Sequence, residues 1–471
     1  MAKKKRILEV KIQEVDYPNK GRAVAEDGRP IEIKGGLPGQ LVELKITKQG
    51  KEKIRGKIRK VLEPSPLEGE SPCPHIQECG GCAYQSLTEE EELSLKQKQL
   101  EKLFDGVISI DIPISSGSSP FGYRNKMEYT FGDEEKGGPL TLGLHKKGKF
   151  HEILPTTHCQ IVHSDFLVLR QGVEDYFQEK GIPFYRRMVH QGVLRHFVIR
   201  RSLRTKEILC NLVTSSQGEI DTKEFMDYIL KLPLEGKITS LWHTINDSLG
   251  DVITPEKVKL LYGQESIVER LCGLEFTIGP FSFFQTNTKS AEVLYEKARN
   301  LLQGEYGQIF DLYSGTGTIA QILAPMAKKV VGIEINEEAV ESAKATAMKN
   351  KLNNVEFICG DVLKEVENLK GHADAIVLDP PREGINPKAL KKIIAFNPKT
   401  FLYISCNPRS LANELPEFIK EGYRIKHIEA LDQFPRTRHV ETVALLSKLD
   451  SDEHINIEVN EKVNVFHARN L

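Results

Sequence analysis

The strongest constraint on the fold lies in the C-terminal half of the chain, where apolar strand-like runs alternate with amphipathic helical stretches. From about residue 308 the strand-like runs occupy 308–313, 329–334, 354–358, 373–378 and 400–404. This alternation predicts a mostly parallel sheet with helices on both faces. Ligands of such sheets bind at the carboxyl ends of the strands. The residues that directly follow these runs are therefore the first candidates for a functional site.

The loops after the first three runs carry the residue types of an adenosine site. Gly315 and Gly317 form a turn without the third glycine of the dinucleotide motif. Glu334 ends the second run about twenty residues further on, where a carboxylate can accept both hydroxyls of a ribose. Asp361 follows the third run, at the expected position of the adenine edge. Two alternatives remain open: a pyrophosphate-binding loop, and acidic residues that only cap helices.

The fourth run leads into a rigid turn at 379–384, in which Asp379 is followed by two prolines and Arg382. Enzymes that methylate amino groups carry an aromatic residue where Arg382 stands, so an amino-group acceptor is not favoured. The fifth run ends at Cys406, which at this position is a candidate nucleophile. Glu441 precedes another apolar run and is a candidate base for the same pocket, with His439 as the rival base.

A second cysteine pattern lies far from this region. Cys73, Cys79 and Cys82 stand in a loop rich in Pro and Gly, and Cys159 is the best candidate for a fourth ligand. Thiolates suit zinc or an iron–sulfur cluster, and the spacing alone does not separate the two. His75 keeps the zinc interpretation open. The other cysteines, apart from Cys406, have apolar neighbours and are predicted to be core residues: Cys210, Cys272 and Cys359.

The charge is distributed unevenly although the whole chain has a net charge of -1. Residues 1–62 hold 17 Lys or Arg and 8 Asp or Glu, which gives +9 and leaves -10 on the remainder. The segment is expected to form short strands at 6–12, 21–25, 30–34 and 40–46, as in a small basic barrel that binds phosphates. A solvated lysine-rich surface is the alternative. With neither a long apolar run nor a signal peptide, the sequence predicts a soluble cytoplasmic protein without membrane contact.

Together these residues resemble one family, the RNA (uracil-5-)-methyltransferases that use S-adenosylmethionine. The resemblance runs from the basic segment to about residue 448. It implies an α/β protein with an N-terminal OB-like β-barrel (a TRAM domain), a central α+β domain with an iron–sulfur loop, and a C-terminal Rossmann-like methyltransferase domain. It also implies a [4Fe-4S] cluster on Cys73, Cys79, Cys82 and Cys159, with Cys406 as nucleophile and Glu441 as base. The implied cofactor pocket consists of Gln285, Tyr313, Glu334, Asp361 and Asp379.

The predicted domains are residues 1–62 (barrel), 63–270 (iron–sulfur loop and central domain) and 271–450 (methyltransferase), with a helix at about 88–105 packed on the catalytic domain and a tail of unassigned role at 451–471. A barrel together with a cluster is more similar to the 23S ribosomal RNA branch of the family than to its transfer-RNA branch. The expected partner is therefore 23S rRNA, and no obligate protein partner is implied. The remaining alternatives are a tRNA methyltransferase and a non-catalytic RNA-binding or assembly protein. TRAM-containing radical enzymes need a different cysteine spacing.

Overall fold

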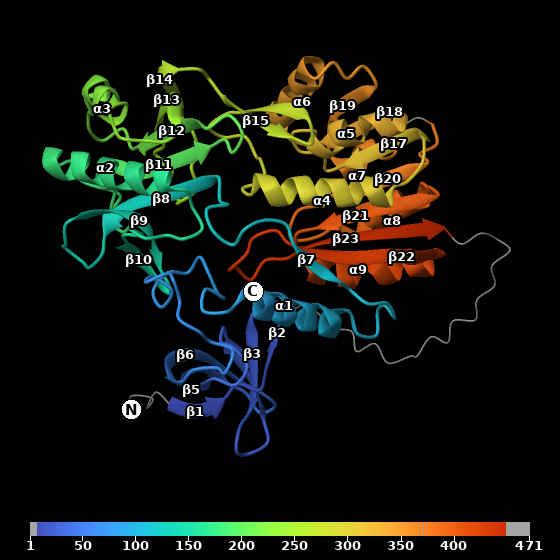
Figure 1. The fold of residues 1–471 in the computed structure, drawn as a ribbon, viewed down its shortest axis with the longest axis horizontal. Coiled ribbons are helices and arrows are strands. Elements are labelled where there is room, and N and C mark those ends of the chain that lie inside the picture. Colours follow the sequence, from blue (N-terminus) through green and yellow to red (C-terminus); the bar gives the residue numbers. More distant parts are fainter. Residues whose placement is uncertain (1–6, 370, 449–471) are drawn as a thin grey trace.

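The computed structural model describes residues 7–369 and 371–448, so the tail predicted at 451–471 lies outside the described residues. Three sheets form the framework: a small N-terminal sheet, a central sheet, and a large C-terminal sheet with helices against it (Figure 1). In the described part of the chain, no helix has the length and apolar character needed to cross a membrane.

The N-terminal sheet is a six-stranded half-barrel with the order β1-β5-β6-β4-β3-β2. Its apolar side chains alternate inward along the strands, and Ile31, Ile33, Val42 and Leu44 are fully enclosed. The four strands predicted here are confirmed, whereas β2 and β6 were not predicted. The strand bounds are β1 (Ile7–Lys11), β2 (Glu14–Asp16), β3 (Lys20–Val24), β4 (Pro30–Lys34), β5 (Leu41–Gln49) and β6 (Ile54–Glu63).

The central sheet has seven strands in the order β10-β9-β8-β11-β12-β13-β14, and its two helices pack on the core that this sheet forms. The strands β11 and β12 are buried along nearly their whole length because they lie in the middle of the sheet. The bounds are β8 (Lys126–Asp133), β9 (Leu140–Lys146), β10 (Lys149–Leu154), α2 (Ser164–Lys180), β11 (Leu194–Arg201), β12 (Glu207–Thr214), α3 (Thr222–Ile229), β13 (Lys237–Ile245) and β14 (Lys257–Gly263).

A short hairpin, β15 (Ile267–Leu271) and β16 (Leu274–Ile278), leads into the C-terminal sheet, whose order is β19-β18-β17-β20-β21-β23-β22-β7. The strands β17 to β21 run parallel, and β23 lies antiparallel to its two neighbours β21 and β22. The strand bounds are β17 (Tyr306–Leu312), β18 (Ala327–Glu334), β19 (Val355–Cys359), β20 (Ala375–Leu378), β21 (Thr400–Ser405), β22 (Tyr423–Asp432) and β23 (Glu441–Lys448).

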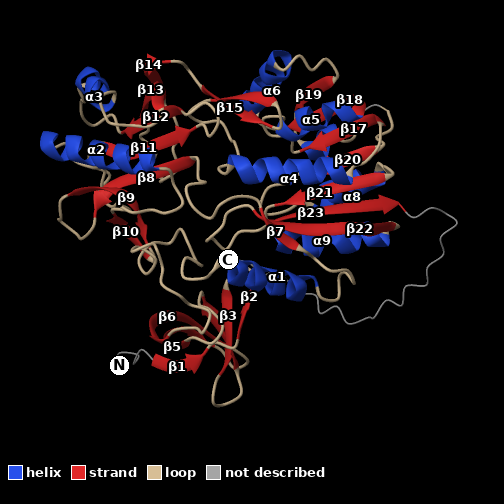
Figure 2. Cartoon of the chain, viewed as in Figure 1, coloured by secondary structure: helices blue, strands red, loops and turns tan. Residues whose placement is uncertain are grey.

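Helices cover both faces of this sheet, as predicted, and each face has its own apolar core (Figure 2). One face packs against α4 (Thr288–Leu301), α5 (Thr318–Leu323) and α6 (Glu337–Lys349), with a short 3-10 turn at Ala324–Met326. The other face packs against α7 (Val362–Glu365), α8 (Pro387–Ala395) and α9 (Pro408–Lys420). This arrangement is Rossmann-like.

A segment from before the central sheet belongs to the same C-terminal body. The helix α1 (Glu89–Phe104) begins at a capping box made by Thr88 and Glu91, contacts α9, and buries Leu100 and Phe104 in the core on that face. The strand β7 (Ile114–Ser116) then adds to the edge of the sheet parallel to β22. The chain thus contributes a helix and a strand to the C-terminal body before it forms the central sheet.

Candidate active site

The register between β21 and β23 brings Cys406 and Glu441 together. The antiparallel ladder pairs Ser405 with Thr442. If the register is continued by one residue beyond the end of the ladder, Cys406 comes opposite Glu441, and the effect of the Glu441 charge on the pKa of the Cys406 thiol agrees with this placement. Opposite residues of an antiparallel pair project to the same face with Cβ atoms about 5 Å apart. A candidate nucleophile and a candidate base therefore meet at the carboxyl end of β21, although 35 positions separate them in the sequence.

Both groups favour their protonated form. Burial raises the pKa of the Cys406 thiol to about 12, and the nearby carboxylates of Glu441 and Asp379 contribute to this rise. Burial likewise raises the pKa of Glu441 to about 8, with a further contribution from Asp379. The Arg382 guanidinium opposes both shifts. The site therefore holds a carboxyl group whose pKa lies near neutrality, as a proton acceptor requires.

The rival base, His439, lies on the loop that precedes β23. Burial lowers its pKa to about 4, and the surrounding cations Arg382, Arg438, Lys96 and Arg124 lower it further. Its ring is therefore neutral at physiological pH, in a cationic environment. Glu441, in contrast, has the position opposite Cys406, so the register favours Glu441 over His439.

The loops after β20 and β21 are tied to each other. The backbone oxygen of Arg382 accepts hydrogen bonds from the Asn407 side chain at 2.8 Å and from the Ser410 hydroxyl at 3.0 Å. Asn407 directly follows Cys406, and Ser410 lies in the first turn of α9. The turn with the two prolines and the loop with the thiol are thereby held as one unit.

The glycine turn after β17 is attached to the end of β18. The Gly315 amide donates to the Glu334 carboxylate at 3.0 Å, and the Asn336 amide donates to the same carboxylate at 2.9 Å. Gly317 has a φ of 71°, and a Cβ atom there would lie 2.4 Å from the Phe357 ring, so only glycine fits. Glu334 thus lies beside the glycine turn, and its role as a ribose-binding acid stays a prediction.

Tyr313, Asp361 and Asp379 follow β17, β19 and β20 respectively, all at the same edge of the sheet. Tyr313 adopts a φ of 67°, which is unusual for a residue with a side chain, and burial raises its pKa to about 12. Asp361 caps α7 by accepting the Leu363 amide at 3.0 Å, so the helix-capping alternative holds for this residue whatever else it binds. Burial raises the pKa of Asp379 to about 7.

Gln285 precedes α4, and its side-chain oxygen accepts a hydrogen bond from Gln433 at 3.2 Å. Two residues that the sequence did not single out lie near this group. Tyr295 of α4 is buried near Gln285 and has its pKa raised by burial and by the carboxylates of Asp379, Glu441 and Asp311. Asp311 is enclosed within β17, accepts the Ala320 amide at 3.0 Å, and has its pKa raised to about 8 by burial.

The only sequence signal for Asp311 is an acidic residue inside an otherwise apolar strand that runs into a glycine turn. Tyr295 gives no such signal, because an aromatic residue on an amphipathic helix is ordinarily a core residue. Its place among three carboxyl groups depends on how α4 packs across the strand ends.

The four cysteines of the second pattern lie near one another. Burial raises the pKa of Cys82 to about 12 and that of Cys159 to about 11, and the neighbouring thiols of Cys73 and Cys79 add to both shifts. Two groups already donate to sulfur: the Gly81 amide to Cys79 at 3.4 Å and the Gln85 side chain to Cys82 at 3.5 Å. Among the described residues, no group of three or more His, Cys, Asp or Glu side chains is arranged so that it could hold a metal ion. Thiols with N–H donors suit a sulfur-ligated cluster in their chemistry, and the cluster on these four cysteines stays a prediction.

The three remaining cysteines do not share one environment. Cys210 is fully buried in the central core, as predicted, and Cys272 is partly buried. Cys359 is exposed, so the prediction that it is a core residue was wrong. Its neighbours are apolar, but it ends β19, an edge strand of the sheet, where one side lacks a covering strand.

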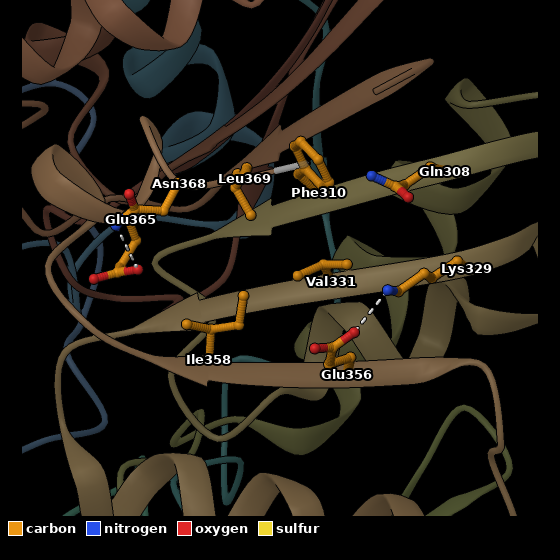
Figure 3. Close-up of a pocket in the computed structure, with 9 residues that line it drawn as sticks. All are labelled: Gln308, Phe310, Lys329, Val331, Glu356, Ile358, Glu365, Asn368 and Leu369. Carbon is orange, nitrogen blue, oxygen red and sulfur yellow. Dashed lines mark hydrogen bonds and ion pairs between the residues drawn. The ribbon is translucent and has the colours of Figure 1, made fainter. Parts of the chain in front are cut away.

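One hollow of about 240 Å³ lies on the sheet but away from these residues (Figure 3). It is lined by alternate residues of β17, β18 and β19, by the end of α7 and by the stretch after that helix, including Gln308, Lys329, Glu356 and Leu369. None of the candidate site residues lines it, because they follow the carboxyl ends of these strands. This hollow is therefore separate from the cofactor site that the sequence predicted.

Comparisons with known proteins agree with this geometry. The family model of tRNA (Uracil-5-)-methyltransferases matches residues 255–449. A Clostridium tetani protein described as an uncharacterized RNA methyltransferase is 44% identical over 94% of this chain and 98% of its own length. A Nanoarchaeum equitans protein with the same description is 33% identical over 94% of both chains.

Among solved structures, a Pyrococcus abyssi tRNA (uracil-54, C5)-methyltransferase in complex with S-adenosyl-L-homocysteine matches with a TM-score of 0.75 and 26% identity. The match covers 93% of this chain and 100% of that one. The likeness thus extends over the N-terminal half-barrel, the central sheet and the Rossmann-like body. The chain belongs to the S-adenosylmethionine-dependent RNA (uracil-5-)-methyltransferases.

Proposed function

We propose that Cys406 is the nucleophile and Glu441 the base of uracil methylation in this protein. The observation that carries the proposal is their opposite position at the end of the β21–β23 ladder. Carbon 5 of uracil is a weak nucleophile. Attack of the Cys406 thiolate on carbon 6 makes carbon 5 reactive as part of an enolate. S-adenosylmethionine supplies the methyl group. Glu441 then takes the proton from carbon 5, and elimination across the C5–C6 bond releases the cysteine.

The raised pKa of Cys406 means that its proton must leave during or before the attack. Arg382 lowers the pKa of both Cys406 and Glu441, and its loop is fastened to Asn407 and Ser410. We therefore assign to Arg382 the role of favouring the anionic forms of the pair. The positive charge of this guanidinium would stabilise the anionic enolate of uracil, whereas it would not stabilise a neutral amine that accepts a methyl group.

The cofactor contacts are proposed for Gln285, Tyr313, Glu334, Asp361 and Asp379. Glu334 lies beside the Gly315 amide and offers a carboxylate to ribose hydroxyls. Tyr313, Asp361 and Asp379 line the same edge of the sheet, where ligands of such folds bind. A [4Fe-4S] cluster is proposed for Cys73, Cys79, Cys82 and Cys159, in a structural role, because ligation by four thiols leaves no iron open for chemistry.

The proposed target is a uridine of 23S rRNA, on the grounds that a basic N-terminal module accompanies the cysteine loop. A uridine of tRNA is the second candidate. It is favoured by the likeness to the Pyrococcus abyssi tRNA enzyme, which extends over that protein's entire chain and therefore includes a matching N-terminal region. Mapping of 5-methyluridine in ribosomal and transfer RNA from cells with and without this protein decides between the two.

The assigned roles are tested with labelled S-adenosylmethionine and total RNA from cells that lack the protein. Cys406→Ala is expected to abolish methyl transfer. RNA that contains 5-fluorouridine should form a lasting covalent adduct with the wild-type protein, because carbon 5 then has no proton to lose. Cys359→Ala, which alters an exposed thiol, is the matched control and should behave as wild type. Full activity of Cys406→Ala would refute the proposal.

A further inference from the structure

A turn of the N-terminal half-barrel is fastened to the catalytic body at Tyr17. Tyr17 follows β2 and is only 4% exposed. Its backbone oxygen accepts a hydrogen bond from the guanidinium of Arg409, which stands three positions after Cys406, in the first turn of α9. On β2 itself, Asp16 and Glu14 both form ion pairs with Lys102 of α1, the first at 2.9 Å. Contacts at two separate points therefore fix the position of this turn relative to the catalytic sheet.

The Tyr17 side chain lies within electrostatic reach of the catalytic pair. Burial raises its pKa well above the ordinary value, the charges of Glu441 and Cys406 raise it further, and Arg409 and Arg382 act in the opposite direction. The hydrogen bond from Arg409 places Tyr17 against the first turn of α9, directly after the loop that carries Cys406, and these electrostatic influences agree with that position. The ring stays neutral at physiological pH and keeps its hydroxyl proton.

The hydroxyl of Tyr17 has no hydrogen-bond partner within residues 7–369 and 371–448. It is also not among the polar atoms of that part of the chain that are enclosed without a partner, so the hydroxyl keeps some exposed surface through which a ligand can reach it. Buried tyrosine hydroxyls ordinarily find a partner, because an unmet donor costs free energy. A neutral donor without a partner, beside a nucleophile and a base, is suited to a ligand with an acceptor oxygen.

Uracil offers such an acceptor. When the thiolate attacks carbon 6, negative charge develops on the carbonyl oxygen at carbon 4, and a fixed O–H donor stabilises that charge more than it stabilises the ground state. Resting on the roles proposed above for Cys406 and Glu441, we propose that Tyr17 is part of the uracil pocket and that its hydroxyl donates a hydrogen bond to the bound base. The N-terminal half-barrel then completes the active site in addition to any contact it makes with the RNA backbone.

The test compares Tyr17→Phe with the wild-type full chain. The ring and its packing are retained, and only the donor is lost. Using total RNA from cells without the protein, kcat is expected to fall about tenfold or more while the KM for RNA changes little. The rate of adduct formation with 5-fluorouridine RNA should fall by a similar factor. Tyr262→Phe, on the partly exposed β14 of the central sheet, is the matched control and should leave both rates unchanged.

Two results would overturn the proposal. One is an unchanged kcat and adduct rate for Tyr17→Phe. The other is an effect confined to the KM for RNA, which would mean that Tyr17 anchors RNA and does not contact the reacting base. The thermal midpoint of Tyr17→Phe shows whether the variant loses stability. If it does, the rate of adduct formation is divided by the amount of bound S-adenosylmethionine, so that the variant and the wild type are compared per folded molecule. Activity in Cys406→Ala would instead refute the assigned nucleophile, so the two failures are distinguishable.

Discussion

The backbone amide of Arg436 donates a hydrogen bond to Oε1 of Glu92 at 2.7 Å. The contact joins α1 to the loop between β22 and β23, across more than 300 positions of sequence. The same Arg436 accepts the backbone amides of Ala83 and Tyr84 at 2.8 and 3.0 Å through its own carbonyl oxygen. Ala83 directly follows Cys82, and the loop that contains Arg436 leads to Glu441, so the cysteine loop is hydrogen-bonded to the segment that carries the proposed base.

A buried ion network holds this loop from the α1 side. Lys96 donates to Glu92 at 2.6 Å and to Asp432 at 2.8 Å, with all three side chains almost fully enclosed. Lys96→Met would leave the enclosed Asp432 carboxylate without its cation and would leave Glu92 paired with Arg436 alone, at 3.3 Å. Because breaking a buried ion pair exposes the full desolvation cost of the remaining charge, we expect a loss of about 3–5 kcal/mol in the free energy of unfolding.

Urea denaturation measures this loss. Lys344→Met is the control, since Lys344 forms a largely exposed pair with Glu341 at 2.9 Å on α6 and should change the free energy of unfolding by less than about 1 kcal/mol. Equal effects of the two variants would mean that the network around Lys96 adds nothing beyond an ordinary surface pair.

The pH dependence of catalysis follows from the proposed base. The Glu441 pKa is raised to about 8, so below that pH the carboxyl group is mostly protonated and cannot accept the proton from carbon 5. The logarithm of kcat/KM should therefore rise more steeply below pH 8 than above it. Glu441→Gln should remove this bend and accumulate a covalent adduct on ordinary uridine RNA. If His439 were the base, its pKa of about 4 would place no bend in the neutral range.

The alternation of apolar runs was sufficient to predict the catalytic sheet. Parallel strands buried on both faces have near-continuous apolar sequences, and the residues at their carboxyl ends meet at one edge whatever the helix packing. For this reason Glu334, Asp361, Asp379 and Cys406 were found at the predicted strand ends. The antiparallel position of β23, and with it the placement of Glu441 opposite Cys406, depends on register and was not visible in local sequence.

The features that the sequence missed depend on contacts between distant segments or on polar surface strands. β6 carries a charged residue at nearly every second position, and its pattern is that of a strand at the surface of a small sheet. Tyr17 and Tyr295 have no local signal, because only the docking of β2 and α4 brings them near Cys406 and Glu441. Cys359 was predicted to be buried because its sequence neighbours are apolar, but these neighbours do not indicate that its strand, β19, lies at the edge of the sheet.

The enclosed carboxyl group of Asp311 predicts that the stability of the folded protein falls as the pH rises. Its pKa is raised to about 8 in the folded protein by burial, against about 4 for an unfolded aspartate. The contribution of the protonated Asp311 to the free energy of unfolding is therefore complete below pH 4. It is lost as the pH rises towards 8, because the unfolded chain then ionises and the folded one does not. Asp311→Asn keeps an acceptor for the Ala320 amide and cannot ionise. Its thermal midpoint should exceed that of the wild type at pH 8, and the difference should shrink at pH 5. A constant difference would refute the assigned protonation.

Removal of one thiol tests the cysteine site separately from catalysis. Burial and neighbouring thiols raise the pKa of Cys79, Cys82 and Cys159, so their anionic forms need a compensating cation. Protein prepared without oxygen should contain about four iron and four sulfide per chain. Cys82→Ser and Cys159→Ser should lose this iron, whereas Cys359→Ser, at an exposed position, should retain it. Ala83, which follows Cys82, donates a hydrogen bond to Arg436 in the C-terminal body. Loss of iron should disturb this contact and therefore also lower the thermal midpoint. Iron-free protein of unchanged stability would show that the thiols hold no structural cluster.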